Sequence, residues 1–564
     1  MGQSTTPRQR ELFAVFLLAL FPACNALNPR LDEDTWWHLA VGKYVVDHRA
    51  VPTEDPFSRI GQEGHVPWVA YSWLHEVGLY GAYSLGGLGG VIASRHLLDT
   101  ATFLTIAWFV LRGSGNRTRS VAVLALVTAT LVPMMLERPW HYTIVFTTLT
   151  LHGVLELRSG TPARRLWWLV PVYALWANLH IQFVLGLGVL GLGFAVTLVE
   201  RLRRGDGLGP LAGWLALIVG CALATLANPY HVRLYQVVWE YATQTAAMRV
   251  VSELAPPDFT VWWNWFLVAL LAAAAGMCVA RRFPLFDTAL LVVGAAFSLR
   301  MQRDIWFGSL CAAAVLTRLP AVPPAPDARP QLPGLVLMTA LALLLARGVW
   351  EVGPGRSKSA AEVNAAQYPA GAVEFVREHR PPGPLYNHFN WGGYLIWALP
   401  EYPVGLDGRT NLYGEERLER AFRTWTGGDG WETDPDLRAA GVVITPKRLG
   451  TQDIALTGLM RSADRWRIVS DLRQSVQFTA VNLMEASQTR QHGKFDVIFC
   501  RNVLIYFDDA SRRLAAENLF DSLVPGGFIC LGHTESMSRI SPLFDVRRFA
   551  DAIVYQRPQG GTHG

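Results

Sequence analysis

Three consecutive carboxylates, Asp32, Glu33 and Asp34, are the first residues whose type and spacing could do chemistry. A carboxylate can take a proton from an attacking group, or it can hold a divalent metal ion. Asp34 also directly precedes TWWHLAVGKYVV, where it would serve as the N-cap of a helix at a membrane surface. His38 would share a helical face with Asp34. Catalysis by Asp32 and Asp34, metal binding there, and helix capping all remain open.

Three arginines near the predicted ends of apolar segments could bind a phosphate group. They are Arg138, Arg233 and Arg303. Guanidinium groups form paired, charge-assisted hydrogen bonds to phosphate oxygens. The other basic residues are spread in short clusters and the net charge is only +5, so no nucleic-acid partner is predicted.

The most specific motifs lie near the C-terminus. The apolar run FDVIFC is typical of a strand in a buried parallel sheet, and the residues after it leave the carboxyl end, where such sheets bind ligands. The region from about 475 to 557 resembles the C-terminal half of the catalytic domain of CheR, the S-adenosylmethionine-dependent methyltransferase that esterifies glutamates of chemotaxis receptors. The matching stretches are VQFTAVNLM (476–484), FDVIFCRNVLIYFD (495–508), LVPGGFICLGHTES (523–536) and IVYQR (553–557).

The CheR resemblance implies a cofactor, a substrate and roles for five residues. S-adenosylmethionine would contact Asn482, Leu483, Arg501 and Asn502. Arg501 and Tyr506 would lie near the transferred methyl group and help to place a chemoreceptor glutamate. Such a site works mainly by aligning the acceptor oxygen with the methyl group and the sulfur.

The elements that must position the N-terminal residues are predicted to be membrane spans. The sequence is 51% hydrophobic and 17% charged, which is far from the average of soluble proteins. Crossing a bilayer takes about 17–25 apolar residues, and we expect about eleven spans. The first, near 11–27, could also be a cleaved signal sequence, because ACNA resembles a cleavage site. The others lie near 88–111, 119–136, 139–157, 166–179, 181–200, 209–227, 262–280, 284–299, 304–318 and 332–350.

The basic residues predict the orientation of these spans, because Lys and Arg stay on the cytoplasmic side. With the N-terminus inside, residues 28–87 form an outward-facing loop, and everything after about 351 is extracytoplasmic as well. We therefore expect a multi-pass protein of the bacterial inner membrane. The predicted inner connections hold Arg112, Arg117 and Arg119, then Arg158, Arg164 and Arg165, then Arg201, Arg203 and Arg204, then Arg281 and Arg282.

Residues 1–471 resemble bacterial polytopic membrane proteins of the GT-C glycosyltransferase layout, whose enzymes use polyprenyl-phosphate sugars. This resemblance implies a polyprenyl-phosphate sugar as partner and places Asp32, Glu33 and Asp34 where GT-C enzymes carry their acidic motif. NWGGYLIW and DGRTNLYG are interpreted as turn and loop signatures of an outer domain. The matching stretches are DEDTWWHLAVGKYVV (32–46), VPTEDPFS (51–58), WVAYSWLHE (68–76), ERPWHYT (137–143), ANLHIQF (177–183), ANPYHVRLY (227–235), NWGGYLIW and LDGRTNLYG.

The predicted fold is therefore an α-helical polytopic membrane protein, followed by a small α/β domain and a partial Rossmann-like methyltransferase segment. Its domains are 1–350, 351–474 and 475–564. In the second domain we expect a helix over 365–379, a strand, turn and helix over 384–399, a strand entering a loop over 402–414, and a strand at 441–446.

The CheR-like part lacks recognisable pieces of a complete enzyme. We find no N-terminal helical domain, no Gly-rich acidic loop and no second strand ending in a ribose-binding Asp. The changeover lies near 471–475 without a linker, whereas natural fusions join at exposed boundaries. Such a fragment would expose an edge strand and an apolar face, unless strands near 441–446 or 466–470 pair with it.

These observations favour a GT-C-like membrane protein whose truncated CheR-type tail is inactive, as a recombined reading frame would produce. Two alternatives stay open. One is a membrane-anchored S-adenosylmethionine-dependent protein-glutamate O-methyltransferase. The other is a non-enzymatic scaffold or lipid-handling protein, which would gain support if the Asp32–Asp34 cluster were only a helix cap.

Overall fold

The computed structural model describes residues 30–113, 117–243, 251–318, 367–428, 430–445, 479–532, 535–549 and 552–559. Their contacts form two compact units, Met1–Arg467 (unit 1) and Ile468–Gly564 (unit 2), which are described separately. The changeover predicted near 471–475 lies outside the described residues.

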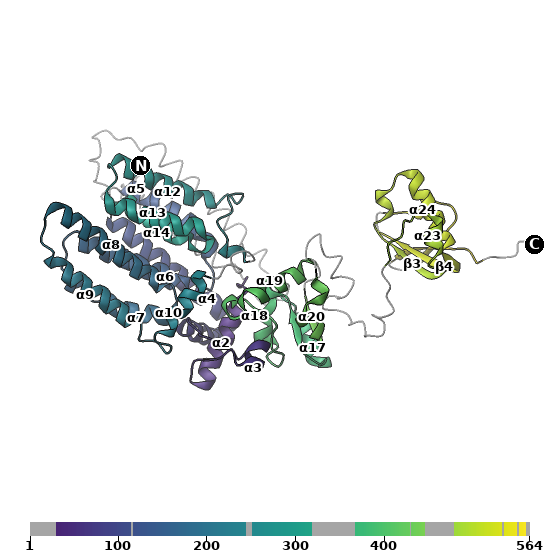
Figure 1. Ribbon diagram of the computed structural model, residues 1–564, viewed down its shortest axis with the longest axis horizontal. Helices are drawn as coiled ribbons and strands as arrows, with labels where there is room; N and C mark the ends of the chain where they lie inside the picture. The colour runs from purple at the N-terminus through teal and green to yellow at the C-terminus, as the bar shows by residue number, and fades with distance from the viewer. Residues whose placement is uncertain are drawn as a thin grey trace, which may run out of the picture. The chain divides into compact units, whose positions relative to one another are not determined.

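Unit 1 begins with a helical body in which long helices lie side by side (Figure 1). Each predicted span within the described residues coincides with a helix, because a long apolar run satisfies its backbone polar groups internally. The predicted spans 11–27 and 332–350 lie outside the described residues. The helices are α4 (Trp73–Gly113), α5 (Arg117–Leu131), α6 (Trp140–Arg158), α7 (Leu169–Leu179), α8 (Phe183–Arg204), α9 (Gly209–Ala224), α10 (Arg233–Thr243), α12 (Asn264–Ala280), α13 (Leu285–Arg300) and α14 (Ile305–Thr317), with short 3-10 turns at Val132–Met134, Ala163–Leu166, Ser252–Leu254 and Gln302–Asp304.

Among the described residues, α8 is the helix that is both long and apolar enough to cross a membrane, with a mean hydropathy of 2.1. Three shorter apolar helices accompany it, at Arg119–Met134, Gly209–Ala224 and Asn264–Ala280. Helices at the predicted places thus confirm the positions of the elements, while the number of spans stays a prediction.

Helix α14 is the centre of this body. All of its residues from Ile305 to Thr317 are buried, and it packs against α13, α12 and α5. Small residues allow the close approach to α13, because a Cβ atom on Gly308 would lie 2.3 Å from Oγ of Ser298. A helix that is apolar all round is typical of the core of a large protein or of a membrane domain.

The predicted outward loop 28–87 is folded onto this body. It contains α2 (Thr35–His48), α3 (Arg59–Gly64) and the start of α4. Helix α2 packs against α4, and Gly42 lets the two backbones come close, since a Cβ atom there would lie 2.1 Å from the carbonyl oxygen of Glu76. The helix predicted after Asp34 is confirmed.

The small α/β part of unit 1 packs against α2. The aromatic ring of Trp36 meets Tyr368 and Tyr394 edge-on, at centroid distances of 5.5 and 5.2 Å. Within residues 367–428 and 430–445, strands β1 and β2 form a parallel pair. The elements are α17 (Ala370–His379), β1 (Leu385–Asn387), α18 (Phe389–Ala398), a 3-10 turn at Thr410–Leu412, α19 (Gly414–Trp425), a 3-10 turn at Trp431–Thr433, α20 (Pro435–Ala439) and β2 (Val442–Ile444).

Two details of this part bear on the sequence prediction. The strand expected at the start of 402–414 is reduced to one bridge between Val404 and Ser58, because Val404 meets the folded loop rather than a neighbouring strand. Strand β2 pairs with β1 within unit 1, and the predicted strand at 466–470 lies outside the described residues.

Unit 2 is a four-stranded sheet with the order β3-β4-β6-β5, covered by helices. Strands β3 and β4 are parallel, whereas β6 runs antiparallel to both of its neighbours, β4 and β5. Asp508 caps the longer helix by accepting a hydrogen bond from the backbone of Ser511, at 2.8 Å. The elements are α23 (Ala486–Arg490), β3 (Phe495–Cys500), α24 (Asp509–Asp521), β4 (Leu523–Leu531), β5 (Asp545–Phe549) and β6 (Ala552–Gln556), with 3-10 turns at Leu504–Tyr506 and Met537–Arg539.

Strand β3 is the edge of this sheet. The sequence predicted a buried strand, yet Val497 and Phe499 are 45% and 74% exposed. The prediction of a buried strand is wrong, because within the described residues β4 is the single neighbour of β3. The expectation of an exposed edge with an apolar face is confirmed for the described part of unit 2.

Candidate functional site

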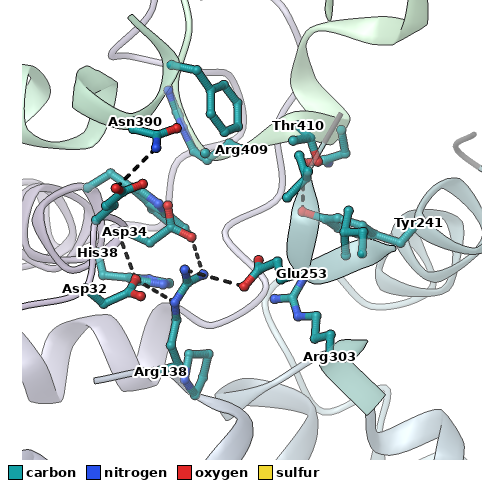
Figure 2. A pocket seen from close by; sticks show the side chains of 18 of the residues that line it. Asp32, Asp34, His38, Arg138, Tyr241, Glu253, Arg303, Asn390, Arg409 and Thr410 are labelled. Atoms are coloured by element: carbon teal, nitrogen blue, oxygen red, sulfur yellow. Dashed lines mark hydrogen bonds and ion pairs between the residues drawn. The ribbon is translucent and has the colours of Figure 1, made fainter. Parts of the chain in front are cut away.

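A polar cavity of about 470 Å³ lies in unit 1, between the helical body and the small α/β part (Figure 2). We call it the acidic cavity. Many separate segments of unit 1 meet there, which brings residues that are far apart in sequence onto one surface. Its lining includes Asp32, Glu33, Asp34, Trp37, His38, Trp68, Tyr71, Glu76, Arg138, Tyr241, Glu253, Arg303, His388, Asn390, Gly408, Arg409, Thr410 and Asn411.

Arg138 gathers the carboxylates on one side of the acidic cavity. Its Nε lies 2.6 Å from Oδ1 of Asp32, its Nη1 is hydrogen-bonded to Asp34, and its Nη2 lies 3.9 Å from Glu253. Figure 2 shows this guanidinium between Asp32, Asp34 and Glu253. Asp34 stands at the N-cap position of α2, but its side chain makes no capping hydrogen bond. The capping prediction is therefore wrong for the side chain, which binds Arg138 instead.

The carboxylates Asp32 and Asp34 do not fit a divalent metal ion. The guanidinium of Arg138 occupies the space that the two carboxylates share, and its positive charge would repel a cation. In the described ranges no group of three or more His, Cys, Asp or Glu side chains is placed to hold a metal. The metal predicted at Asp32 and Asp34 is not supported.

Glu33 is the carboxyl group of the cluster that Arg138 does not bind directly. It accepts a hydrogen bond of 3.2 Å from Nδ2 of Asn390. Burial, followed by the charges of Asp32 and Asp34, raises the pKa of Glu33 to about 7. A carboxylate with a pKa near neutrality suits general base catalysis. From the sequence, Glu33 was identified as part of the acidic cluster, but only Asp32 and Asp34 were predicted to be catalytic.

The raised pKa of Glu33 predicts a pH-dependent effect of Glu33→Gln. Below about pH 4.5 the carboxyl group of Glu33 is protonated in both the folded and the unfolded chain, so its ionisation does not change the free energy of unfolding. Between about pH 4.5 and 7 this carboxyl group ionises in the unfolded chain but stays largely protonated in the folded chain. Rising pH therefore lowers the free energy of unfolding of the wild type over this range. We therefore expect the stability advantage of Glu33→Gln to grow from pH 4.5 to 7 and then to level off, as measured by thermal unfolding. The exposed Glu63→Gln is the control, and an advantage that is constant with pH would contradict this expectation.

The DGR motif closes the opposite wall of the acidic cavity. Arg409 is buried, and its Nη1 and Nη2 lie 2.5 Å from Asp55 and 2.6 Å from Asp407. Gly408 touches the acidic cluster, because a Cβ atom there would lie 2.1 Å from Oδ1 of Asp34. From the sequence, NWGGYLIW and DGRTNLYG were interpreted as turn and loop signatures. Nothing in the sequence indicated that Asn390 and Gly408 line the site.

A second, mainly apolar cavity of about 160 Å³ adjoins the first. We call it the apolar groove. Both cavities are lined by Tyr71, Tyr241, Leu254 and Arg303. The hydroxyl groups of Tyr71 and Tyr241 lie 3.3 Å apart at this junction. Other residues of the groove are His180, Ile181, Val184, Leu185, Val238, Phe297, Met301 and Asp304.

Arg303 is the predicted phosphate-binding arginine that lines both cavities, and the negative charge of Glu253 acts on it. No hydrogen bond or ion pair within the described ranges involves its guanidinium, which points into the acidic cavity (Figure 2). Arg138 is held by carboxylates, and Arg233 is exposed and lines neither cavity. The structure thus separates three arginines that the sequence treated alike.

The predicted CheR-type residues lie on two loops of unit 2. Arg501 and Asn502 follow β3, where Asn502 has a φ of 58° and its backbone N–H donates to Glu535 at 2.7 Å. Leu483 accepts a hydrogen bond of 2.8 Å from Asn518. Tyr506 is 81% exposed.

The described loops hold the predicted cofactor-binding residues, while residues 446–478 of the chain lie outside the described residues. Across residues 479–532, 535–549 and 552–559, no hydrogen bond or ion pair joins Asn482 or Leu483 to Arg501, Asn502 or Tyr506. Nor does any buried side-chain N or O atom of these ranges lack a partner, so none is held ready for a ligand.

Comparison with known proteins shows the C-terminal resemblance. The family model described as CheR methyltransferase, SAM binding domain matches residues 456–552, and so begins before the boundary at 475. Chemotaxis protein methyltransferase 2 of Vibrio cholerae is 49% identical over 102 residues, which are 18% of this chain and 35% of that protein. Chemotaxis protein methyltransferase 1 of Pseudomonas aeruginosa is 31% identical over 121 residues, or 22% and 42% of the two chains. The chain thus spans well under half the length of these relatives.

Two solved structures of membrane glycosyltransferases resemble the chain at low similarity. Arabinosyltransferase EmbB from Mycobacterium smegmatis has a TM-score of 0.36 and 15% identity, covering 64% of this chain and 39% of that one. ArnT from Cupriavidus metallidurans, bound to undecaprenyl phosphate, has a TM-score of 0.31 and 13% identity, covering 78% and 90%.

Proposed function

We propose that unit 1 is an inner-membrane transferase of GT-C type that moves a sugar from a polyprenyl-phosphate donor to an acceptor. The observation that carries this proposal is the junction of the two cavities at Arg303. A lipid-linked sugar has a polar head, a phosphate and an apolar chain, and the acidic cavity, Arg303 and the apolar groove follow in the same order.

The groups of the acidic cavity can support transfer. The acceptor oxygen attacks the sugar carbon that carries the phosphate, the bond from that carbon to the phosphate oxygen breaks, and the acceptor proton passes to a carboxylate. Glu33 is the carboxylate suited to receive it, because its pKa is about 7. Asp32 and Asp34 hold the guanidinium of Arg138 in place, and burial together with their charges raises the pKa of Glu33. They act as positioning residues in this scheme.

Binding of a short isoprenyl phosphate tests this function. The full chain in lipid nanodiscs is titrated with farnesyl phosphate and, separately, with uncharged farnesol. We expect clearly tighter binding of the phosphate, and transfer from polyprenyl-phosphate sugars that is lost in Asp32→Asn and Asp34→Asn. Equal affinity for the two lipids would contradict the proposal. Normal transfer by both Asn variants would exclude Asp32 and Asp34 from the reaction.

We further propose that unit 2 is an incomplete CheR-type segment and inactive as a methyltransferase. Its exposed edge strand β3 and its two separate loops support this view. The second candidate function, S-adenosylmethionine-dependent methylation of chemoreceptor glutamates, is favoured by the identity of 49% over 102 residues. The orientation proposed for the spans would place unit 2 outside the cytoplasm, away from the cofactor.

Calorimetry with S-adenosylmethionine decides between these two functions. We expect the full chain to show no measurable binding, because the sequence lacks the Gly-rich acidic loop and the ribose-binding Asp of a complete enzyme. The second candidate predicts micromolar binding that Arg501→Ala or Asn502→Ala removes. The matched variant Arg513→Ala, on α24, is the control for a general loss of charge.

A further inference from the structure

His38 and Glu76 form a buried pair in the wall of the acidic cavity. Nδ1 of His38 lies 3.0 Å from Oε1 of Glu76, and the two side chains are 3% and 1% exposed. The other carboxyl oxygen, Oε2 of Glu76, is buried without a hydrogen-bond partner. In the part of the chain that the structure describes, the imidazole of His38 is therefore the hydrogen-bond partner of the Glu76 carboxyl group.

The packing of α2 on α4 creates this pair. Gly42 lies one helical turn after His38, and a Cβ atom on Gly42 would lie 2.1 Å from the carbonyl oxygen of Glu76. Only glycine allows this approach without moving a helix. The ring of Trp37 lies against His38 at a centroid distance of 3.6 Å and further restricts the imidazole.

Burial determines where the protons of the pair lie. It raises the pKa of Glu76 well above its ordinary value and lowers the pKa of His38 well below its own, the latter helped by His75, Arg138, His180 and Arg303. Glu76 is therefore protonated, and its carboxyl O–H donates a hydrogen bond to Nδ1 of a neutral imidazole. The remaining ring proton is then on Nε2. No hydrogen bond from the described ranges involves this Nε2, and His38 lines the acidic cavity.

We propose that His38 binds the phosphate of the lipid donor through its Nε2–H, and that Glu76 is the positioning residue that fixes this tautomer. The proposal rests on the proposed function of unit 1. His38 and Arg303 both line the acidic cavity, and in this proposal the phosphate lies between them. An ionised Glu76 would instead place the lone pair of Nε2 toward the phosphate, where it repels oxygen.

Titration of farnesyl phosphate and farnesol into the full chain in nanodiscs tests the pair. His38→Ala should weaken the binding of farnesyl phosphate by about tenfold or more, as expected for a hydrogen bond to a charged group, and should leave farnesol unchanged. His38→Gln should retain most of the affinity, because its amide N–H replaces Nε2–H. Glu76→Gln should also retain it, because the amide can donate to Nδ1, whereas Glu76→Leu should not.

Each other result overturns a defined part of the proposal. An unchanged phosphate affinity in His38→Ala excludes the contact, and an equal loss for farnesol assigns His38 to packing. If Glu76→Gln binds as weakly as Glu76→Leu, Glu76 does not act as a proton donor to Nδ1. A wild type that binds farnesyl phosphate no better than farnesol refutes the proposed function itself, which distinguishes that failure from a failure of the pair.

Discussion

Replacing Arg409 with methionine is expected to lower the free energy of unfolding by about 3–5 kcal/mol, the cost of breaking a buried ion pair by removing one partner. Arg409 is 2% exposed, and Asp55 and Asp407 are fully buried beside it. Its Nε also donates to Asp407 at 2.8 Å. Methionine fills a similar volume but leaves two carboxylates without their cation.

The loss should appear in the thermal unfolding of the full chain in detergent, followed by tryptophan fluorescence. Trp68 is a suitable reporter, because the guanidinium of Arg409 lies 4.7 Å from its ring centroid. Arg423→Met, at an exposed position of α19, is the matched control and should unfold like the wild type. Acidic pH should reduce the difference, since protonated carboxyls no longer need the cation. A variant as stable as the wild type at neutral pH would show that the DGR loop is not essential for the fold.

The ion pairs of Arg409 also show where sequence reasoning stops. Asp55 and Arg409 are 354 positions apart, and no periodicity or spacing links two single residues over that distance. The motifs VPTEDPFS and LDGRTNLYG could each be recognised as distinctive. That they meet, and that the contact closes a cavity over Asp34, depends on the tertiary fold.

The helices were predictable for a simple physical reason. A run of apolar residues long enough to cross a bilayer must satisfy its backbone hydrogen bonds internally, so its secondary structure follows from composition. Helix α2 was predictable from Asp34 and the segment after it. The partner of the Asp34 side chain was not predictable. The same carboxylate can cap the helix or bind Arg138, and the folded position of Arg138 determines which contact forms.

Strand β3 shows the opposite case. Its sequence correctly predicted an apolar strand, yet burial is a property of the partners and not of the strand. The described part of unit 2 covers β3 on one edge only, so residues suited to a sheet interior become exposed. The sequence did predict this exposure once the missing pieces of the CheR domain were considered.

Arg303→Ala is expected to weaken the binding of farnesyl phosphate by about 10- to 100-fold, which corresponds to the loss of hydrogen bonds from a charged group. Arg303 lines both cavities, and within the described ranges its guanidinium makes no hydrogen bond or salt bridge, while the charge of Glu253 acts on it. Arg138 cannot replace it, because Asp32 and Asp34 already bind that guanidinium. Calorimetry on the full chain in nanodiscs measures the effect, with farnesol expected to bind as it does to the wild type.

Two further variants separate a specific phosphate contact from general attraction between charges. Arg303→Lys keeps the charge but loses the paired donors of guanidinium, so it should recover only part of the affinity. Arg201→Ala removes an exposed charge near the end of α8, where its partner is the carbonyl oxygen of Gly207 at 2.6 Å. If Arg201→Ala weakens binding as much as Arg303→Ala does, the affinity for the phosphate depends only on the net charge of the protein. If Arg303→Ala alone weakens it, the lipid phosphate lies where the acidic cavity meets the apolar groove.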